Sequence, residues 1–125
     1  MVEPRYLLDT NALIHLLCGA HPPLRQRVQQ QDVGAVVTST LCVAEALVGA
    51  RAKGKEAGLA DLVRRIEPVP FDLAAAFANV QVPFKRARLD RLIAAHALSL
   101  GLIVVTHNEA DFADVPGLTV ENWTR

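Results

Sequence analysis

Short apolar runs alternate with longer segments of helical periodicity along the whole chain. The apolar runs are flanked by turn-forming residues, and they predict strands at residues 6–8, 33–37, 69–71, 102–105 and 119–123. Capping residues and glycines bound the segments between them, which predict helices at residues 12–17, 24–31, 41–52, 73–80 and 89–100 and a further helix that ends at residue 65. Strands that alternate with helices predict a three-layer α/β/α domain with a central, mostly parallel sheet.

Length and composition are those of one folded domain. With 125 residues, 51% hydrophobic and 21% charged, the chain can bury a single core, and one domain is expected over residues 1–125. Cys18 and Cys42 fall in apolar helical segments and are expected to be buried, reduced thiols. The first residues lack a signal-peptide pattern and no apolar run reaches about 18 residues, so we expect a cytoplasmic protein with no membrane contact.

Acidic side chains occur where a parallel sheet would bring them together. Asp9 follows the first predicted strand, and open parallel sheets bind ligands beyond the carboxyl ends of their strands. The same residue also suits the N-cap of the next helix, so its position alone assigns no function. Glu109 and Asp111 come shortly after the strand at 102–105, again at a carboxyl end.

Two further acids lie on predicted helices. Glu45 interrupts an apolar helix that has no broad polar side, and we expect its carboxylate to be shielded from water. A shielded carboxylate needs a metal ion, a proton or a salt bridge, for example to an arginine. Asp90 lies in the first turn of the helix at 89–100, where its charge would also stabilise the helix dipole.

Carboxylates that face one cleft repel each other and favour a bound divalent cation. Oxygen ligands suit Mg²⁺ or Mn²⁺, whereas zinc prefers His and Cys ligands. The histidines are scattered along the sequence without the spacing of a zinc site: His15, His21, His96 and His107. The sequence therefore predicts a magnesium or manganese site.

Three stretches of the sequence resemble PIN-domain ribonuclease toxins of the VapC type. Residues 6–15 (YLLDTNALIH) look like the opening of these toxins, and residues 90–102 (DRLIAAHALSLGL) resemble the helix that bears their third acid. Residues 105–108, 111–112 and 115–123 are similar to the C-terminal signature of the same family. The resemblance thus extends from one end of the chain to the other.

The resemblance implies a set of site residues. Asp9, Glu45 and Asp90 correspond to the metal-binding and catalytic acids, and Asn11 and Thr106 match polar residues that orient them. Many family members have a fourth acid where this chain has Asn108. Two nearby acids are candidates for that role, Asp111 first and Glu109 second, and the segment before Asp90 is shorter than in the family.

The resemblance also implies a function. VapC-type proteins are toxins of type II toxin–antitoxin systems, which use Mg²⁺ or Mn²⁺ to hydrolyse RNA phosphodiesters. The expected partners are an RNA substrate, a cognate VapB-type antitoxin and a second copy of the chain in a homodimer. The basic residues around Asp90 are expected to contact the RNA backbone, unless they form an ordinary solvated surface: Lys85, Arg86, Arg88 and Arg91.

Two other functions remain open. A PIN-like module that binds RNA or a partner with weak or no catalysis would tolerate Asn108 and the shortened segment. A phosphatase with Asp9 as nucleophile, similar to the haloacid dehalogenases, would need a second Asp two residues later, where this chain has Asn11. Metal-dependent stabilisation and RNA cleavage discriminate the nuclease from the binding module.

Overall fold

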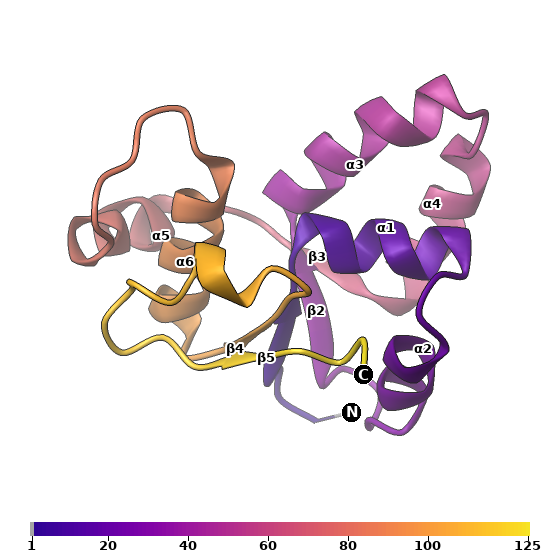
Figure 1. Cartoon of the computed structure of the whole chain (residues 1–125), viewed down its shortest axis with the longest axis horizontal. Coiled ribbons are helices and arrows are strands. Elements are labelled where there is room, and N and C mark those ends of the chain that lie inside the picture. The colour runs from indigo at the N-terminus through magenta and orange to yellow at the C-terminus, as the bar shows by residue number, and fades with distance from the viewer. Residues whose placement is uncertain (1) are drawn as a thin grey trace.

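The structure, a computed structural model, describes residues 2–125 (Figure 1). Its centre is a five-stranded sheet in the order β3-β2-β1-β4-β5, in which every neighbouring pair is parallel. The strands are β1 (Tyr6–Leu8), β2 (Val36–Ser39), β3 (Glu67–Val69), β4 (Ile103–Val105) and β5 (Val120–Glu121). The expected α/β architecture with a parallel sheet is confirmed.

Six α-helices flank this sheet. In Figure 1, α5 and α6 lie on one side of the strands and α1 to α4 on the other. The helices are α1 (Thr10–Cys18), α2 (Pro22–Gln29), α3 (Thr40–Ala52), α4 (Glu56–Arg65), α5 (Leu73–Ala78) and α6 (Leu89–Leu100), with short 3-10 turns η1 (Asn79–Gln81) and η2 (Glu109–Asp111). Within residues 2–125, no helix combines the length and the apolar character that a membrane span requires.

Element boundaries differ from the expectation in the second and third strands. The helix at 89–100 is confirmed residue for residue, and Gly101 ends it with a left-handed φ of 66°. The second strand begins at Val36, three residues later than expected. The third strand lies at 67–69 rather than 69–71 and therefore includes Pro68, a residue with no backbone N–H to donate. Proline is tolerated here because β3 is an edge strand that pairs only with β2.

Both faces of the sheet are covered by helices. Leu7 belongs to one hydrophobic cluster, whereas its neighbours Tyr6 and Leu8 belong to a second cluster that includes Trp123. Successive side chains of a strand point to opposite faces, so two separate clusters on one strand mean that the strand is buried on both sides. Such burial explains why the central strands read as unbroken apolar runs.

Backbone and side-chain hydrogen bonds align the carboxyl ends of the central strands. The Asp9 N–H donates to the Val105 carbonyl at 3.1 Å, which joins the end of β1 to the end of β4. The Thr38 hydroxyl, fully buried in β2, donates to the Leu8 carbonyl at 2.9 Å. These bonds fix the position from which Asp9 leaves the sheet.

The hydroxyl of Thr38 should therefore contribute measurably to stability. We expect Thr38→Val to lower the free energy of unfolding by about 1–2 kcal/mol, because it removes a buried hydrogen bond while it keeps the β-branched shape. Urea denaturation followed by circular dichroism measures this change. Thr119→Val is the matched control at an exposed site, and equal effects of the two substitutions would contradict the role of the Thr38 bond.

Candidate active site

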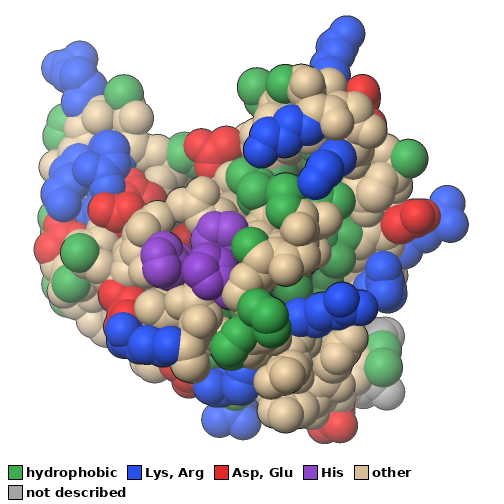
Figure 2. Space-filling view, turned by 45° about the vertical axis from the view of Figure 1, so that its right-hand side comes forward, with side chains coloured by type: hydrophobic (Ala, Val, Ile, Leu, Met, Phe, Trp, Pro, Cys, Tyr) green, Lys and Arg blue, Asp and Glu red, His purple; other side chains and the backbone are tan. Residues whose placement is uncertain are grey.

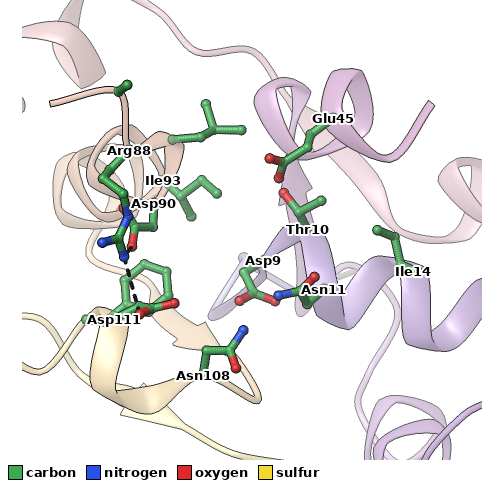
Figure 3. A pocket seen from close by; sticks show the side chains of 13 residues that line it. Asp9, Thr10, Asn11, Ile14, Glu45, Arg88, Asp90, Ile93, Asn108 and Asp111 are labelled. Atoms are coloured by element: carbon green, nitrogen blue, oxygen red, sulfur yellow. Dashed lines mark hydrogen bonds and ion pairs between the residues drawn. The ribbon is translucent and has the colours of Figure 1, made fainter. Parts of the chain in front are cut away.

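A pocket of about 350 Å³ opens at the carboxyl ends of the strands. Figure 3 shows that its polar side chains come from separate parts of the fold and point toward a common space. The acids of the pocket are Asp9 after β1, Glu45 on α3, Asp90 on α6 and Asp111 in η2. Four carboxylates that are distant in sequence therefore line one pocket.

Asp9 is the buried member of this group. Its side chain is 5% exposed, and Oδ1 accepts a hydrogen bond from the Ala12 N–H at 2.8 Å, so the residue is also the N-cap of α1. Burial raises the pKa of Asp9, and the charges of Glu45 and Asp111 act in the same direction; hydrogen bonds from Thr106 and Ala12 partly offset the increase. Asp9 thus serves both the helix and the pocket.

Glu45 lines the pocket but is exposed, so the expectation that it is shielded from water is wrong. Helix α3 buries only the stripe Cys42, Ala46 and Ala50. Val43 is partly buried against the core, whereas Leu47 and Val48 lie at the surface, 42% and 74% exposed. Apolar composition did not reveal which face of the helix the rest of the fold would cover. The carboxylate of Glu45 nevertheless points toward Asp9 and Thr10 in Figure 3.

Asp90 and Asp111 share one cation, the guanidinium of Arg88 (Figure 3). Arg88 donates to Asp90 Oδ2 at 2.5 Å and lies 3.2 Å from Asp111 Oδ1. Asp90 stands in the first turn of α6 and Arg88 at its N-cap, so the pair forms between residues two positions apart. This ion pair occupies the side of the pocket opposite Glu45.

The remaining predicted residues divide between pocket and surroundings. Asn11 and Asn108 line the pocket, and the Thr106 hydroxyl accepts a hydrogen bond from the Asn108 N–H at 2.9 Å. Glu109 is directed elsewhere, because its carboxylate bonds Asn122 at 3.0 Å and Arg125 at 2.9 Å. Of the two acids near position 108, the pocket therefore includes only Asp111.

Arg91 does not fit the expected contact with RNA. Its side chain is only 5% exposed and bonds the Pro83 carbonyl, the Asp111 carbonyl and the Asp114 carboxylate, the last at 3.1 Å. It also lies 3.4 Å from Asp90 Oδ1. Arg91 is therefore a clamp between α6 and the η2 segment. Lys85, Arg86 and Arg88, by contrast, are exposed and accessible to a ligand.

The chemistry of the pocket fits a hard divalent cation. Its acids and amides offer oxygen ligands. The charges of Glu45 and Asp111 help to raise the pKa of Asp9. As they stand, however, no three His, Cys, Asp or Glu side chains in the part of the chain that the structure describes are gathered closely enough to hold an ion. The oxygen donors are present, and Arg88 already pairs with two of them.

Sequence reasoning missed a histidine cluster. Ring centroids of His15, His21 and His107 lie 4.6 to 5.8 Å apart, and the three rings form the purple group in Figure 2. Desolvation lowers the pKa of His15, as do the two neighbouring imidazoles. Cys18 also departs from expectation, because its thiol is exposed at the end of α1, whereas Cys42 is buried as predicted.

Comparison with known proteins adds a family to this geometry. Residues 6–118 match the family described as "PIN domain". The chain is 33% identical over 131 residues to the "tRNA(fMet)-specific endonuclease VapC" of Shigella flexneri, covering 96% of this chain and 98% of that protein. It is also 33% identical over 130 residues to "Ribonuclease VapC2" of Haemophilus influenzae, covering 95% and 98%.

Solved structures show the same fold. DNA-bound VapBC from Salmonella typhimurium contains a chain with a TM-score of 0.85 and 27% identity, covering 96% of this chain and 98% of that chain. A chain of VapBC-1 from nontypeable Haemophilus influenzae gives a TM-score of 0.80 at 25% identity, with the same two coverages. Fold and sequence similarity both extend over nearly the whole chain.

The clamp by Arg91 can be tested through stability. Arg91→Ala removes the donor of two backbone carbonyls and one of the two cations at Asp114, which keeps Lys85 at 3.5 Å. We therefore expect a loss of about 3 kcal/mol in the free energy of unfolding. Arg86→Ala removes the same charge from an exposed position and should change stability by less than about 0.5 kcal/mol. Chemical denaturation measures both variants, and a mild effect of Arg91→Ala would refute the clamp.

The raised pKa of Asp9 predicts that its charge destabilises the folded protein. A carboxyl group whose pKa is raised by folding favours the folded state at low pH, and that contribution is lost as the pH rises through the raised pKa. Asp9→Asn keeps a capping acceptor and removes the charge. Without divalent ions at about pH 7.5 we expect its Tm to rise by roughly 2–5 °C, and the gain should shrink on acidification.

The control for this experiment is Asp61→Asn, an exposed carboxylate on α4. Differential scanning fluorimetry across the pH range follows all three proteins. A Tm of Asp9→Asn below that of the unaltered protein at about pH 7.5 would contradict a destabilising charge at Asp9.

Proposed function

Because the chain belongs to the PIN-domain family, we propose that it is a metal-dependent endoribonuclease of the VapC type, the toxin of a type II toxin–antitoxin system. The family match covers residues 6–118, and relatives named as VapC ribonucleases match nearly the whole chain. The proposed reaction is hydrolysis of RNA phosphodiester bonds with Mg²⁺ or Mn²⁺ as cofactor.

One observation carries this proposal: four carboxylates from four separate segments line a single pocket. Asp9 is buried there, and the charges of Glu45 and Asp111 raise its pKa. Like charges that face one pocket repel each other, and the pKa of Asp9 is raised in part for this reason. Capping of α1 explains the position of Asp9 but not the convergence of four acids, for which binding of a divalent ion would account.

Each polar residue of the pocket has a proposed role. Asp9, Glu45, Asp90 and Asp111 supply oxygen ligands, and Glu45, the most accessible of them, can also accept a proton from water. The Thr106 hydroxyl favours the ionised form of Asp9 by lowering its pKa, and Asn11 borders the pocket from α1. When bound, Mg²⁺ or Mn²⁺ would supply water activation and would shield the phosphate charge.

The RNA backbone needs positive charge beside the acids. Lys85 and Arg86 are exposed on the loop that leads into α6, and Arg88 lines the pocket itself. In Figure 2, blue side chains stand to the left and to the right of the histidine cluster. We infer that the RNA strand runs along Lys85, Arg86 and Arg88, with its scissile phosphate at the pocket acids.

Exposed apolar side chains support protein partners. Val48 on α3 is 74% exposed, and Leu73 and Phe77 on α5 are each 71% exposed. Large apolar groups at a surface are typical of interfaces. The two solved structures described above are VapBC complexes, which supports a VapB-type antitoxin as the proposed partner. A second copy of the chain and a cytoplasmic setting are proposed as well.

A catalytically weak module that binds RNA or a partner is the second candidate. Asn108 borders the pocket where many family members have an acid, and an amide is a poorer ligand than a carboxylate. A phosphatase with Asp9 as nucleophile loses support, because the pocket residue two positions later is Asn11. The remaining contest is between nuclease and binder.

Cleavage of RNA decides that contest. Purified protein without antitoxin is incubated with total cellular RNA in Mg²⁺ or in EDTA, and the new RNA ends are mapped. We expect cleavage only with metal, and Asp9→Asn should reduce the rate at least about 100-fold because it removes the central ligand. RNA binding without any metal-dependent ends would leave the chain a binder.

The fourth acid is tested by a matched pair of variants in the same assay. Asp111→Asn alters a pocket acid, whereas Glu109→Gln alters an acid that is directed toward Arg125. We expect a loss of about tenfold or more for the first variant and little change for the second. The reverse order would assign the fourth position to Glu109.

A further inference from the structure

We propose that Arg88 is an internal counter-ion that alternates between the pocket acids and the phosphate of the RNA. Its guanidinium holds Asp90 at 2.5 Å and lies 3.2 Å from Asp111. Two of the four proposed ligands are therefore paired with one positive side chain of the same molecule (Figure 3). This inference rests on the proposed function, because it concerns the residues that would receive the cation.

The pairing of Arg88 divides the pocket into two halves. Asp90 and Asp111 have a basic partner, whereas Asp9 and Glu45 take part in no ion pair within residues 2–125. A divalent cation attracted to Asp9 and Glu45 would meet Arg88 on the other two acids. Because a cation and a guanidinium repel each other and need the same carboxylate oxygens, they compete for Asp90 and Asp111.

Arg88 is able to leave, and Arg91 is not. The side chain of Arg88 is 42% exposed, and both of its pairs are with side chains that already face solvent or the pocket. Arg91 is 5% exposed and bonds two backbone carbonyls as well as Asp114. The backbone next to Arg88 is also strained: Ala87, directly before it, has a left-handed φ of 56°, a conformation that costs a non-glycine residue free energy.

A second pocket offers Arg88 a place beyond the acids. This pocket of about 690 Å³ shares Ala87, Arg88 and Leu89 with the acidic pocket, so Arg88 stands on the border between the two. Its charged lining residues are Lys85, Arg88 and Arg91, and none of its lining residues is acidic. An RNA phosphate at this border would be bound by the planar guanidinium, which suits bidentate contact with phosphate oxygens.

Because Arg88 is proposed to contact either the pocket acids or the RNA phosphate, its removal should have opposite effects on metal affinity and on RNA affinity. Removal of Arg88 frees Asp111 and leaves Asp90 with only the 3.4 Å contact to Arg91. Arg88→Ala should therefore bind Mn²⁺ at least about threefold more tightly than the unaltered protein. The same variant should bind a 2′-O-methyl oligoribonucleotide more weakly when Mn²⁺ is saturating, since it lacks a phosphate contact. A variant that merely lost structure would weaken both interactions together.

Isothermal titration with Mn²⁺ alone tests the first half, with Arg86→Ala as the control. Arg86 has the same charge two positions away, is exposed, and takes part in no ion pair in the described part of the chain. Its removal should change Mn²⁺ affinity by less than about 1.5-fold through long-range electrostatics. Fluorescence anisotropy with the oligoribonucleotide measures the second half.

The outcomes separate this inference from the proposed function. Tighter Mn²⁺ binding and weaker RNA binding by Arg88→Ala, with Arg86→Ala unchanged toward Mn²⁺, support the counter-ion. Equal Mn²⁺ affinities of the unaltered protein and Arg88→Ala overturn it and leave the nuclease proposal intact. If neither protein binds Mn²⁺, both proposals fail.

Discussion

The buried carboxylate of Asp9 at the end of the central strand is the constraint around which the rest of the structure is arranged. Strand β1 lies between β2 and β4, and the bond from the Asp9 N–H to the Val105 carbonyl fixes the point where the chain leaves the sheet. There Asp9 caps α1 and faces the pocket at the same time. The same side chain supports the fold by its hydrogen bond and opposes it by its charge, a conflict that is common at functional sites.

The topology of the sheet brings the other acids to the same place as Asp9. Parallel connections return the chain to the same edge of the sheet, so α3, α6 and the η2 segment each bring one carboxylate to the pocket. The protein pairs two of these carboxylates with the single positive charge of Arg88 and holds the surrounding segments with Arg91. The first arginine is exposed and the second buried, so equal charges three residues apart serve a movable contact and a fixed one.

Sequence reasoning identified what is local and missed what depends on packing. Helix α6 was predicted to the residue because its apolar stripe and Gly101 are local signals, whereas β3 was misplaced because a proline-containing edge strand has a weak pattern. Glu45 was assigned to the pocket through family resemblance, but its burial was wrong because composition does not tell which face of α3 is covered. The histidine cluster could not be predicted, since its three rings come together only through the fold.

The central claim is that the pocket acids bind a divalent cation, and diffraction from crystals soaked in Mn²⁺ tests it most directly. The account predicts an anomalous peak within coordination distance of Asp9 and at least one more of the pocket acids, with the Arg88 guanidinium turned away from Asp90. An acidic pocket without a peak, or a peak at the cluster of His15, His21 and His107 instead, would contradict the account.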